Sequence, residues 1–128
     1  MTRTLEQQLS ALAWATRTNA VVRKTKVGCA IVGIDNKLYS GCNIEHDFCK
    51  SIHAEVCALS SMAKSGCKTF TYLLIVAEMT KFTPCGDCLD WLTMFGDKEQ
   101  SFVGFQPTPE VEISWFQLNI LTPHYPIK

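Results

Sequence analysis

Two short segments constrain the fold more than any other part of this sequence: His53-Ala54-Glu55 and Pro84-Cys85-Gly86-Asp87-Cys88. Cys85 and Cys88 are three residues apart, a spacing that lets both thiols reach one metal ion from the first turn of a helix. His53 and Glu55 are two apart, and two residues turn a regular helix by about 200°, so inside a helix their side chains would point in roughly opposite directions. We therefore predict that His53 lies at the junction of a loop and a helix, beside the two cysteines.

One imidazole and two thiolates make a set of three zinc ligands: His53, Cys85 and Cys88. A zinc ion held by three protein ligands keeps its fourth position for water, as in catalytic sites. Glu55 is then a carboxylate that does not bind the metal and can move protons. Two other interpretations stay open, a redox-active pair of thiols and a structural zinc site with a fourth protein ligand. The candidates for that fourth ligand are Cys49, Cys57 and His46.

Composition narrows the class of protein. The 128 residues suffice for one compact domain, which we expect to span residues 1–128, and 47% of them are hydrophobic, as in a globular fold. The 12 lysines and arginines balance the 12 aspartates and glutamates, so we expect a small-molecule substrate and no nucleic-acid partner. The seven cysteines are odd in number, and we find neither a secretory leader nor a membrane-spanning run. We expect a reducing, cytoplasmic setting with no membrane partner.

The hydrophobic pattern predicts helices over residues 4–18, 53–65 and 84–95, and strands over 27–34, 37–44, 72–77, 101–106 and 110–115. The first helix is expected to begin with a Thr4–Gln7 capping box, and the third with Thr83 as N-cap and Pro84 at its first position. Residues 46–52 are expected to form an irregular loop, and 116–127 a short helical or irregular tail. The order of elements predicts an α/β fold, with a mixed sheet of about five strands and helices on both faces.

Polar residues flank the first two predicted strands. Asn43 and Glu45 lie two residues apart at the end of the second strand, on one side of an extended chain. A purely structural alternative for Asn43 is to cap a turn after the strand. Before the first strand, residues 23–26 contain three basic side chains, which form either a solvated loop or the lip of a pocket.

Read in order, these segments resemble the cytidine deaminases, the small nucleoside-acting branch of the zinc deaminases, for which a histidine, a glutamate two residues on and a later P-C-x-x-C form an established signature. The segment at 27–30 is similar to the family's V-G-A-A strand, and Gly41–Glu45 to its G-x-N-x-E segment. Residues 53–55 and 84–88 match its H/C-A-E and P-C-G-x-C motifs, and 120–123 looks like its L-L-P close.

The resemblance implies a three-layer α/β/α fold, one Zn²⁺ per chain, and hydrolytic deamination of cytidine or deoxycytidine to uridine or deoxyuridine, as in pyrimidine salvage. Hydroxide supplied at the zinc would attack C4 of the base while Glu55 shuttles protons. By the same resemblance, Asn43 and Glu45 would bind ribose hydroxyls, and Ala54 would offer its backbone to the base. Short members of the family assemble as homotetramers, so we expect a homo-oligomer.

The sequence departs from the family at three places. The aromatic of a Y-S-x-F segment is absent from residues 22–25, so a stacking group would come from Phe48 or Trp14. His46 replaces the usual Asn after Glu45, and Leu89-Asp90 replaces an Arg-Gln pair. The departures favour as alternatives a modified cytosine nucleoside of the blasticidin S type, or a nucleotide whose anionic group meets residues 23–26. Further alternatives are an editing deaminase acting on nucleic acid and a zinc-stabilised binding module without activity.

Overall fold

The computed structural model describes residues 1–22, 24–46, 50–79 and 84–122 of the chain. Its elements follow one another as α1 (Arg3–Arg17), β1 (Gly28–Gly33), β2 (Leu38–Cys42), β3 (Ile44–Glu45), β4 (Ser51–Ile52), α2 (Ala54–Lys64), β5 (Phe70–Val76), α3 (Gly86–Phe95), β6 (Phe102–Gln106), β7 (Ser114–Gln117) and α4 (Leu118–Leu121). Within this part of the chain, none of the helices is both long enough and apolar enough to cross a membrane.

The main sheet has five strands in the order β2-β1-β5-β6-β7. β5 and β6 run parallel, and the other neighbouring pairs run antiparallel. The parallel pair is joined through α3, and the β1–β2 hairpin turns at Asn36, whose φ of 64° suits a tight turn. The mixed sheet predicted from the sequence is therefore confirmed.

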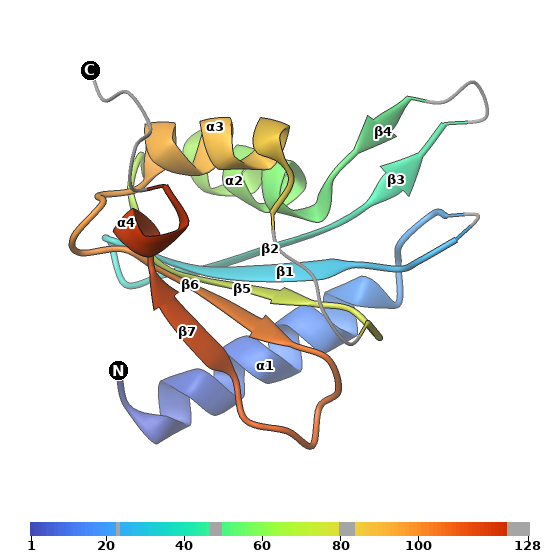
Figure 1. The fold of residues 1–128 in the computed structure, drawn as a ribbon, viewed down its shortest axis with the longest axis horizontal. Helices are drawn as coiled ribbons and strands as arrows, with labels where there is room; N and C mark the ends of the chain where they lie inside the picture. Colours follow the sequence, from blue (N-terminus) through green and yellow to red (C-terminus); the bar gives the residue numbers. More distant parts are fainter. Residues whose placement is uncertain (23, 47–49, 80–83, 123–128) are drawn as a thin grey trace.

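The helices cover both faces of this sheet: α1 lies on one face, and α2 and α3 lie on the other (Figure 1). Neighbouring residues of β1, an inner strand of the sheet, point into two different cores. Ala30 packs in a cluster with Leu9 of α1, whereas Cys29 packs in a cluster with Leu59 of α2. All six residues of β1 are buried, as expected for a continuous apolar strand covered on both sides. The arrangement is the three-layer α/β/α sandwich that the family resemblance implied.

The start of α1 differs from the prediction. Thr2 is the N-cap, and its hydroxyl accepts a hydrogen bond from the backbone N–H of Leu5 at 3.1 Å. The Thr4–Gln7 capping box is therefore wrong, because Thr4 already lies inside the first turn. Both Thr2 and Thr4 suit an N-cap, and the sequence pattern selected the later of the two.

The start of α3 also differs. Cys85, not Thr83, is the N-cap, and Pro84 precedes the helix instead of occupying its first position. The Cys85 sulfur accepts a hydrogen bond from the backbone N–H of Cys88 at 3.4 Å. A candidate metal ligand therefore caps the helix in place of the threonine that the sequence indicated. Thr83 lies outside the described residues. The predicted end of the helix is confirmed, because Gly96 is its C-cap.

Two strand predictions need correction. Residues 46–52 are not wholly irregular, because Ile44–Glu45 and Ser51–Ile52 pair as a small antiparallel ladder. The strand expected at 110–115 begins only at Ser114, which pairs with Phe105. The Val111 carbonyl accepts instead from the Gln106 side chain, and two prolines without N–H donors precede it, so this stretch forms a connection.

Candidate metal centre and active site

His53 lies where the sequence requires it. It is the N-cap of α2, with φ −76° and ψ 153°, and its backbone is extended while Ala54 and Glu55 are already helical. In a continuous helix the side chains of His53 and Glu55 would point in roughly opposite directions. The change of backbone conformation at His53 allows both to face the same site. The predicted junction of loop and helix at His53 is therefore confirmed. Glu55, in the first turn of α2, is 6% exposed.

The two cysteines come from the corresponding end of α3. Cys85 is the N-cap and is exposed, whereas Cys88 lies one turn further on and is fully buried. The positive end of the helix dipole favours negative charge on both sulfurs. The two helices therefore present their candidate ligands from their N-terminal ends.

These three side chains form a compact donor set. His53 Nδ1 lies 3.0 Å from Cys88 Sγ and 3.4 Å from Cys85 Sγ, and all the ligand atoms lie within 4.8 Å of one another. A tetrahedral zinc with bonds of about 2.0 Å to nitrogen and 2.3 Å to sulfur separates such atoms by about 3.6 Å. One imidazole and two thiols at this spacing fit zinc in both chemistry and size.

A fourth protein ligand does not join the set within the part of the chain that the structure describes. Neither Cys57 nor His46 belongs to the group, and Cys49 lies outside that part. The set of three fits a metal with an open position better than a closed structural site.

Burial is the main cause that raises the pKa of the Cys88 thiol above its usual range, and the negative charge of Glu55 adds to the rise. A thiol in this position needs a nearby cation to become a thiolate, and a bound metal ion supplies that charge. Burial likewise raises the pKa of Cys29, which lies beneath the site in β1 and does not join the donor set. Cys29 is therefore a neutral core residue.

A cavity of about 390 Å³ opens beside the donor set. Its walls include every sequence-predicted site residue except Cys88, which is fully buried. They also include residues that the sequence did not indicate, from the ends of β5 and β4. The lining residues are Lys24, Thr25, Val27, Asn43, Glu45, Ser51, His53, Ala54, Glu55, Ile75, Ala77, Met79 and Cys85. Ile75, Ala77 and Met79 lie at the carboxyl end of a strand in a parallel pair, where sites in α/β folds usually form.

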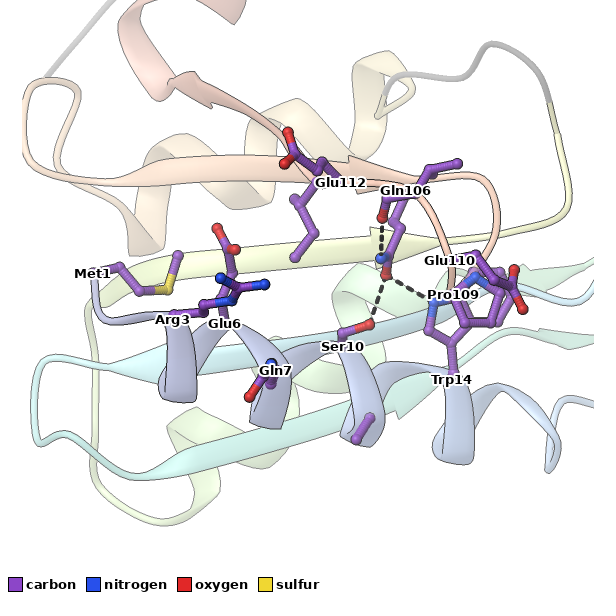
Figure 2. Close-up of a pocket in the computed structure, with 13 residues that line it drawn as sticks. Met1, Arg3, Glu6, Gln7, Ser10, Trp14, Gln106, Pro109, Glu110 and Glu112 are labelled. Atoms are coloured by element: carbon purple, nitrogen blue, oxygen red, sulfur yellow. Dashed lines mark hydrogen bonds between the residues drawn. The ribbon is translucent and has the colours of Figure 1, made fainter.

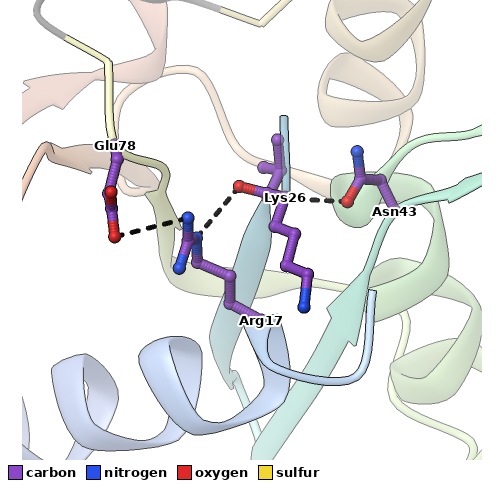
Figure 3. A network of polar contacts seen from close by, with 5 residues as sticks. Arg17, Lys26, Asn43 and Glu78 are labelled. Atoms are coloured by element: carbon purple, nitrogen blue, oxygen red, sulfur yellow. Dashed lines mark hydrogen bonds and ion pairs between the residues drawn. The ribbon is translucent and has the colours of Figure 1, made fainter. Parts of the chain in front are cut away.

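Asn43 is held by the backbone at the entrance to β1. Its Oδ1 accepts from the Val27 N–H at 2.8 Å, and its Nδ2 donates to the Thr25 carbonyl at 2.9 Å. Figure 3 shows this side chain directed at the same segment that Arg17 contacts from the other side. One donor hydrogen and one lone pair of the amide remain for another partner. Asn43 therefore braces the chain, and it is still able to bind a ligand.

No aromatic side chain is among the residues that line this cavity in the described structure. Trp14 lies elsewhere, in a second cavity of about 790 Å³ between α1 and residues 109–113 (Figure 2). There its Nε1 donates to the side-chain oxygen of Gln106 at 2.8 Å. Trp14 is therefore not a stacking group for the site beside the metal ligands, and Phe48 lies outside the described residues.

Comparisons with known proteins agree with this geometry. A family model described as the cytidine and deoxycytidylate deaminase zinc-binding region matches residues 3–103. The crystal structure of cytidine deaminase from Burkholderia pseudomallei is similar, with a TM-score of 0.82 and 26% identity, over 97% of this chain and 98% of that one. Cytidine deaminase from Mycobacterium tuberculosis matches with a TM-score of 0.76 and 23% identity, over 91% and 93% of the two chains.

A third solved structure shares the fold more distantly. The dCMP deaminase of cyanophage S-TIM5 matches with a TM-score of 0.54 and 20% identity, over 86% of this chain and 90% of that one. No curated protein matches the sequence.

Proposed function

The chain belongs to the cytidine and deoxycytidylate deaminase zinc-binding family, and from this premise we propose that it catalyses the hydrolytic deamination of cytidine or deoxycytidine to uridine or deoxyuridine, with release of ammonia. The observation that carries the proposal is the donor set of His53, Cys85 and Cys88 beside a cavity into which the buried Glu55 also faces. A metal site with an open position and an adjacent carboxylate is what hydrolysis of an amidine-like C–N bond requires.

Each residue has a distinct part in this proposal. His53, Cys85 and Cys88 would hold one zinc ion, which when bound supplies a hydroxide nucleophile at neutral pH. Glu55 accepts the proton released from water and delivers it to N3 of the base, and it then carries a second proton, from the hydroxyl newly attached to C4, to the departing amine. The Ala54 backbone orients the base, and Asn43 and Glu45 bind the sugar hydroxyls.

The test is the replacement Glu55→Gln in zinc-loaded protein, with cytidine conversion followed by ultraviolet absorbance. The amide keeps the size of the side chain but neither accepts nor returns a proton in the same way, so we expect kcat to fall by about 10² to 10⁴. Zinc content, measured by mass spectrometry, is expected to stay unchanged because Glu55 is outside the donor set. Glu110→Gln, an exposed glutamate outside this cavity, is the matched control. Full activity in Glu55→Gln would refute the assignment of the proton shuttle.

A second candidate substrate is favoured by one feature of the cavity. Lys24 lines it, and no described lining residue supplies an aromatic face for stacking. We infer that a cytosine compound with an anionic substituent, such as the 5′-monophosphate or a modified nucleoside of the blasticidin type, competes with cytidine for the site. An ammonium group at the cavity wall attracts a phosphate or carboxylate most strongly where water is partly excluded.

The two substrate classes are separated by kcat/KM for cytidine, its monophosphate and blasticidin S. If Lys24 selects an anionic group, Lys24→Gln lowers kcat/KM for the charged substrate by about tenfold and leaves cytidine within twofold. Lys37→Gln, on the hairpin turn outside this cavity, is the charge-matched control. A strong preference of the wild-type protein for plain cytidine would rule this candidate out.

We also propose that the chain works as a homotetramer in the cytoplasm. The outer layer of the fold carries exposed apolar side chains on α3 and α4, namely Trp91, Met94 and Ile120, and contacts with further copies would cover them. A reducing compartment keeps Cys85 and Cys88 as the thiolates that bind a metal. Light scattering after size-exclusion chromatography tests the assembly, and a monomeric mass at micromolar concentration would refute it.

A further inference from the structure

Arg17 lies behind the cavity and touches both of the chain segments that form two of its walls. Its Nε donates to the Lys26 carbonyl at 3.0 Å, and its terminal nitrogen lies 3.6 Å from a carboxylate oxygen of Glu78 (Figure 3). Arg17 itself is not among the residues that line the cavity. Its side chain is 18% exposed, so the guanidinium is largely enclosed by these contacts.

The first of these walls is the extended segment 25–27, which Asn43 and Arg17 hold at different backbone groups. The Asn43 side chain donates a hydrogen bond to the Thr25 carbonyl and accepts one from the Val27 N–H. The Lys26 carbonyl lies between these two groups and points to the other side of an extended chain. There it accepts the hydrogen bond from Arg17. Thr25, Val27 and Asn43 line the cavity, whereas Arg17 fixes the same segment from outside it.

The second wall follows the end of β5. Ala77 and Met79 line the cavity, and Glu78 between them points away to Arg17. The Glu78 side chain is 71% exposed, and exposed ion pairs contribute little. The hydrogen bond to Lys26 is therefore the stronger of these two polar contacts of Arg17.

The base of the Arg17 side chain is fixed as well. A Cβ at Gly28 would meet the Arg17 Cβ at 2.8 Å and the Ala13 carbonyl oxygen at 2.2 Å, so the end of α1 lies directly on the start of β1. The guanidinium carbon also lies 5.3 Å from the centre of the Trp14 ring, within the range of a cation–π contact. A side chain held at both ends transmits the position of α1 to the segment that it contacts.

We propose that Arg17 is a positioning residue for substrate binding, which holds the 25–27 wall of the cavity in place from outside. This inference rests on the proposed deaminase function. Because His53, Glu55 and the cysteines lie on α2 and α3, loss of Arg17 leaves the donor set and the proton shuttle in place. Loss of Arg17 is therefore expected to raise KM and to leave kcat nearly unchanged.

The experiment compares Arg17→Gln, Arg17→Lys and Glu78→Gln with the wild type, all zinc-loaded, for cytidine turnover at 25 °C. Arg17→Gln raises KM about tenfold, the change expected for one charge-assisted hydrogen bond, and keeps kcat within twofold. Arg17→Lys recovers most of the affinity because an ammonium can still donate to the Lys26 carbonyl. Glu78→Gln changes KM less than twofold.

Hydrogen exchange of the backbone amides, followed by mass spectrometry, gives a readout that does not need turnover. Arg17→Gln raises exchange in residues 24–28 about fivefold or more, whereas the amides of α2 keep the wild-type rate. A fall of kcat equal to that of kcat/KM, or an unchanged KM together with unchanged exchange at 24–28, would overturn the proposal. If the wild type does not turn over any cytosine substrate, the proposed function fails and the exchange result alone decides whether Arg17 holds the wall.

Discussion

Asn43 has one role in this structure and a second one in the proposed function, and a pair of substrates can separate the two. The side chain braces the segment before β1 through two part-buried hydrogen bonds, at 2.8 Å to Val27 and 2.9 Å to Thr25. In the proposed function it also binds the sugar. At about 1 kcal/mol for each hydrogen bond, Asn43→Ala removes about 2 kcal/mol of stability. For a chain of this size that lowers Tm by about 8 °C.

The sugar role is measured by comparing cytidine with 2′,3′-dideoxycytidine, which lacks both hydroxyls. If Asn43 binds a hydroxyl, the wild type prefers cytidine, and Asn43→Ala lowers the ratio of the two kcat/KM values by about tenfold. If Asn43 only braces the wall, kcat/KM falls by the same factor for both substrates and the ratio is unchanged. Asn119→Ala, an exposed asparagine on α4, is the control and is expected to change neither Tm nor the ratio. An unchanged ratio in Asn43→Ala would refute sugar recognition while leaving the brace intact.

Three further predictions follow from the same structure. Cys88→Ser abolishes stoichiometric zinc in metal analysis because a buried donor is lost, whereas Cys57→Ser, outside the donor set, keeps it. Leu92→Ala, at a fully buried position of α3, lowers the free energy of unfolding by about 3 kcal/mol in urea titrations, and a loss under 1 kcal/mol would contradict the packing. The Tyr39 hydroxyl is the main cause that lowers the pKa of the Asp35 carboxyl. This contribution to stability is present above the unfolded pKa of about 3.9 and is lost as the pH falls through the lower folded value, so Tyr39→Phe flattens the stability curve below pH about 4.

Features that follow from helix geometry or from a run of apolar residues could be predicted from the sequence. The spacing of His53 and Glu55 excludes a continuous helix through both, and the structure places the change of conformation at His53. The continuous apolar run before Asp35 required cover on both faces, and β1 is buried throughout. In each case a local rule allowed a single answer.

Other features depended on contacts that the sequence does not display. Cys85 became a helix cap because its sulfur accepts from Cys88, and the usual preference for a threonine pointed to the wrong residue. Trp14 has the chemistry of a stacking group, but a strand from the far end of the chain holds its ring through Gln106. The pairing of Ile44 with Ile52 is too short to leave an alternating pattern.

The candidate metal ligands come from side chains at helix starts, and this explains why so little sequence is enough to define the site. His53 and Cys85 are both N-caps, residues whose backbone is extended while the next turn is helical. A cap position fixes the direction of the side chain relative to the helix axis, so the packing of α2 beside α3 on one face of the sheet also fixes the distance between the ligands. Substitutions that shift either helix along its axis should therefore change metal affinity before they change the fold. The surrounding cavity wall, built from loop segments and held by Asn43 and Arg17, is free to vary with the substrate.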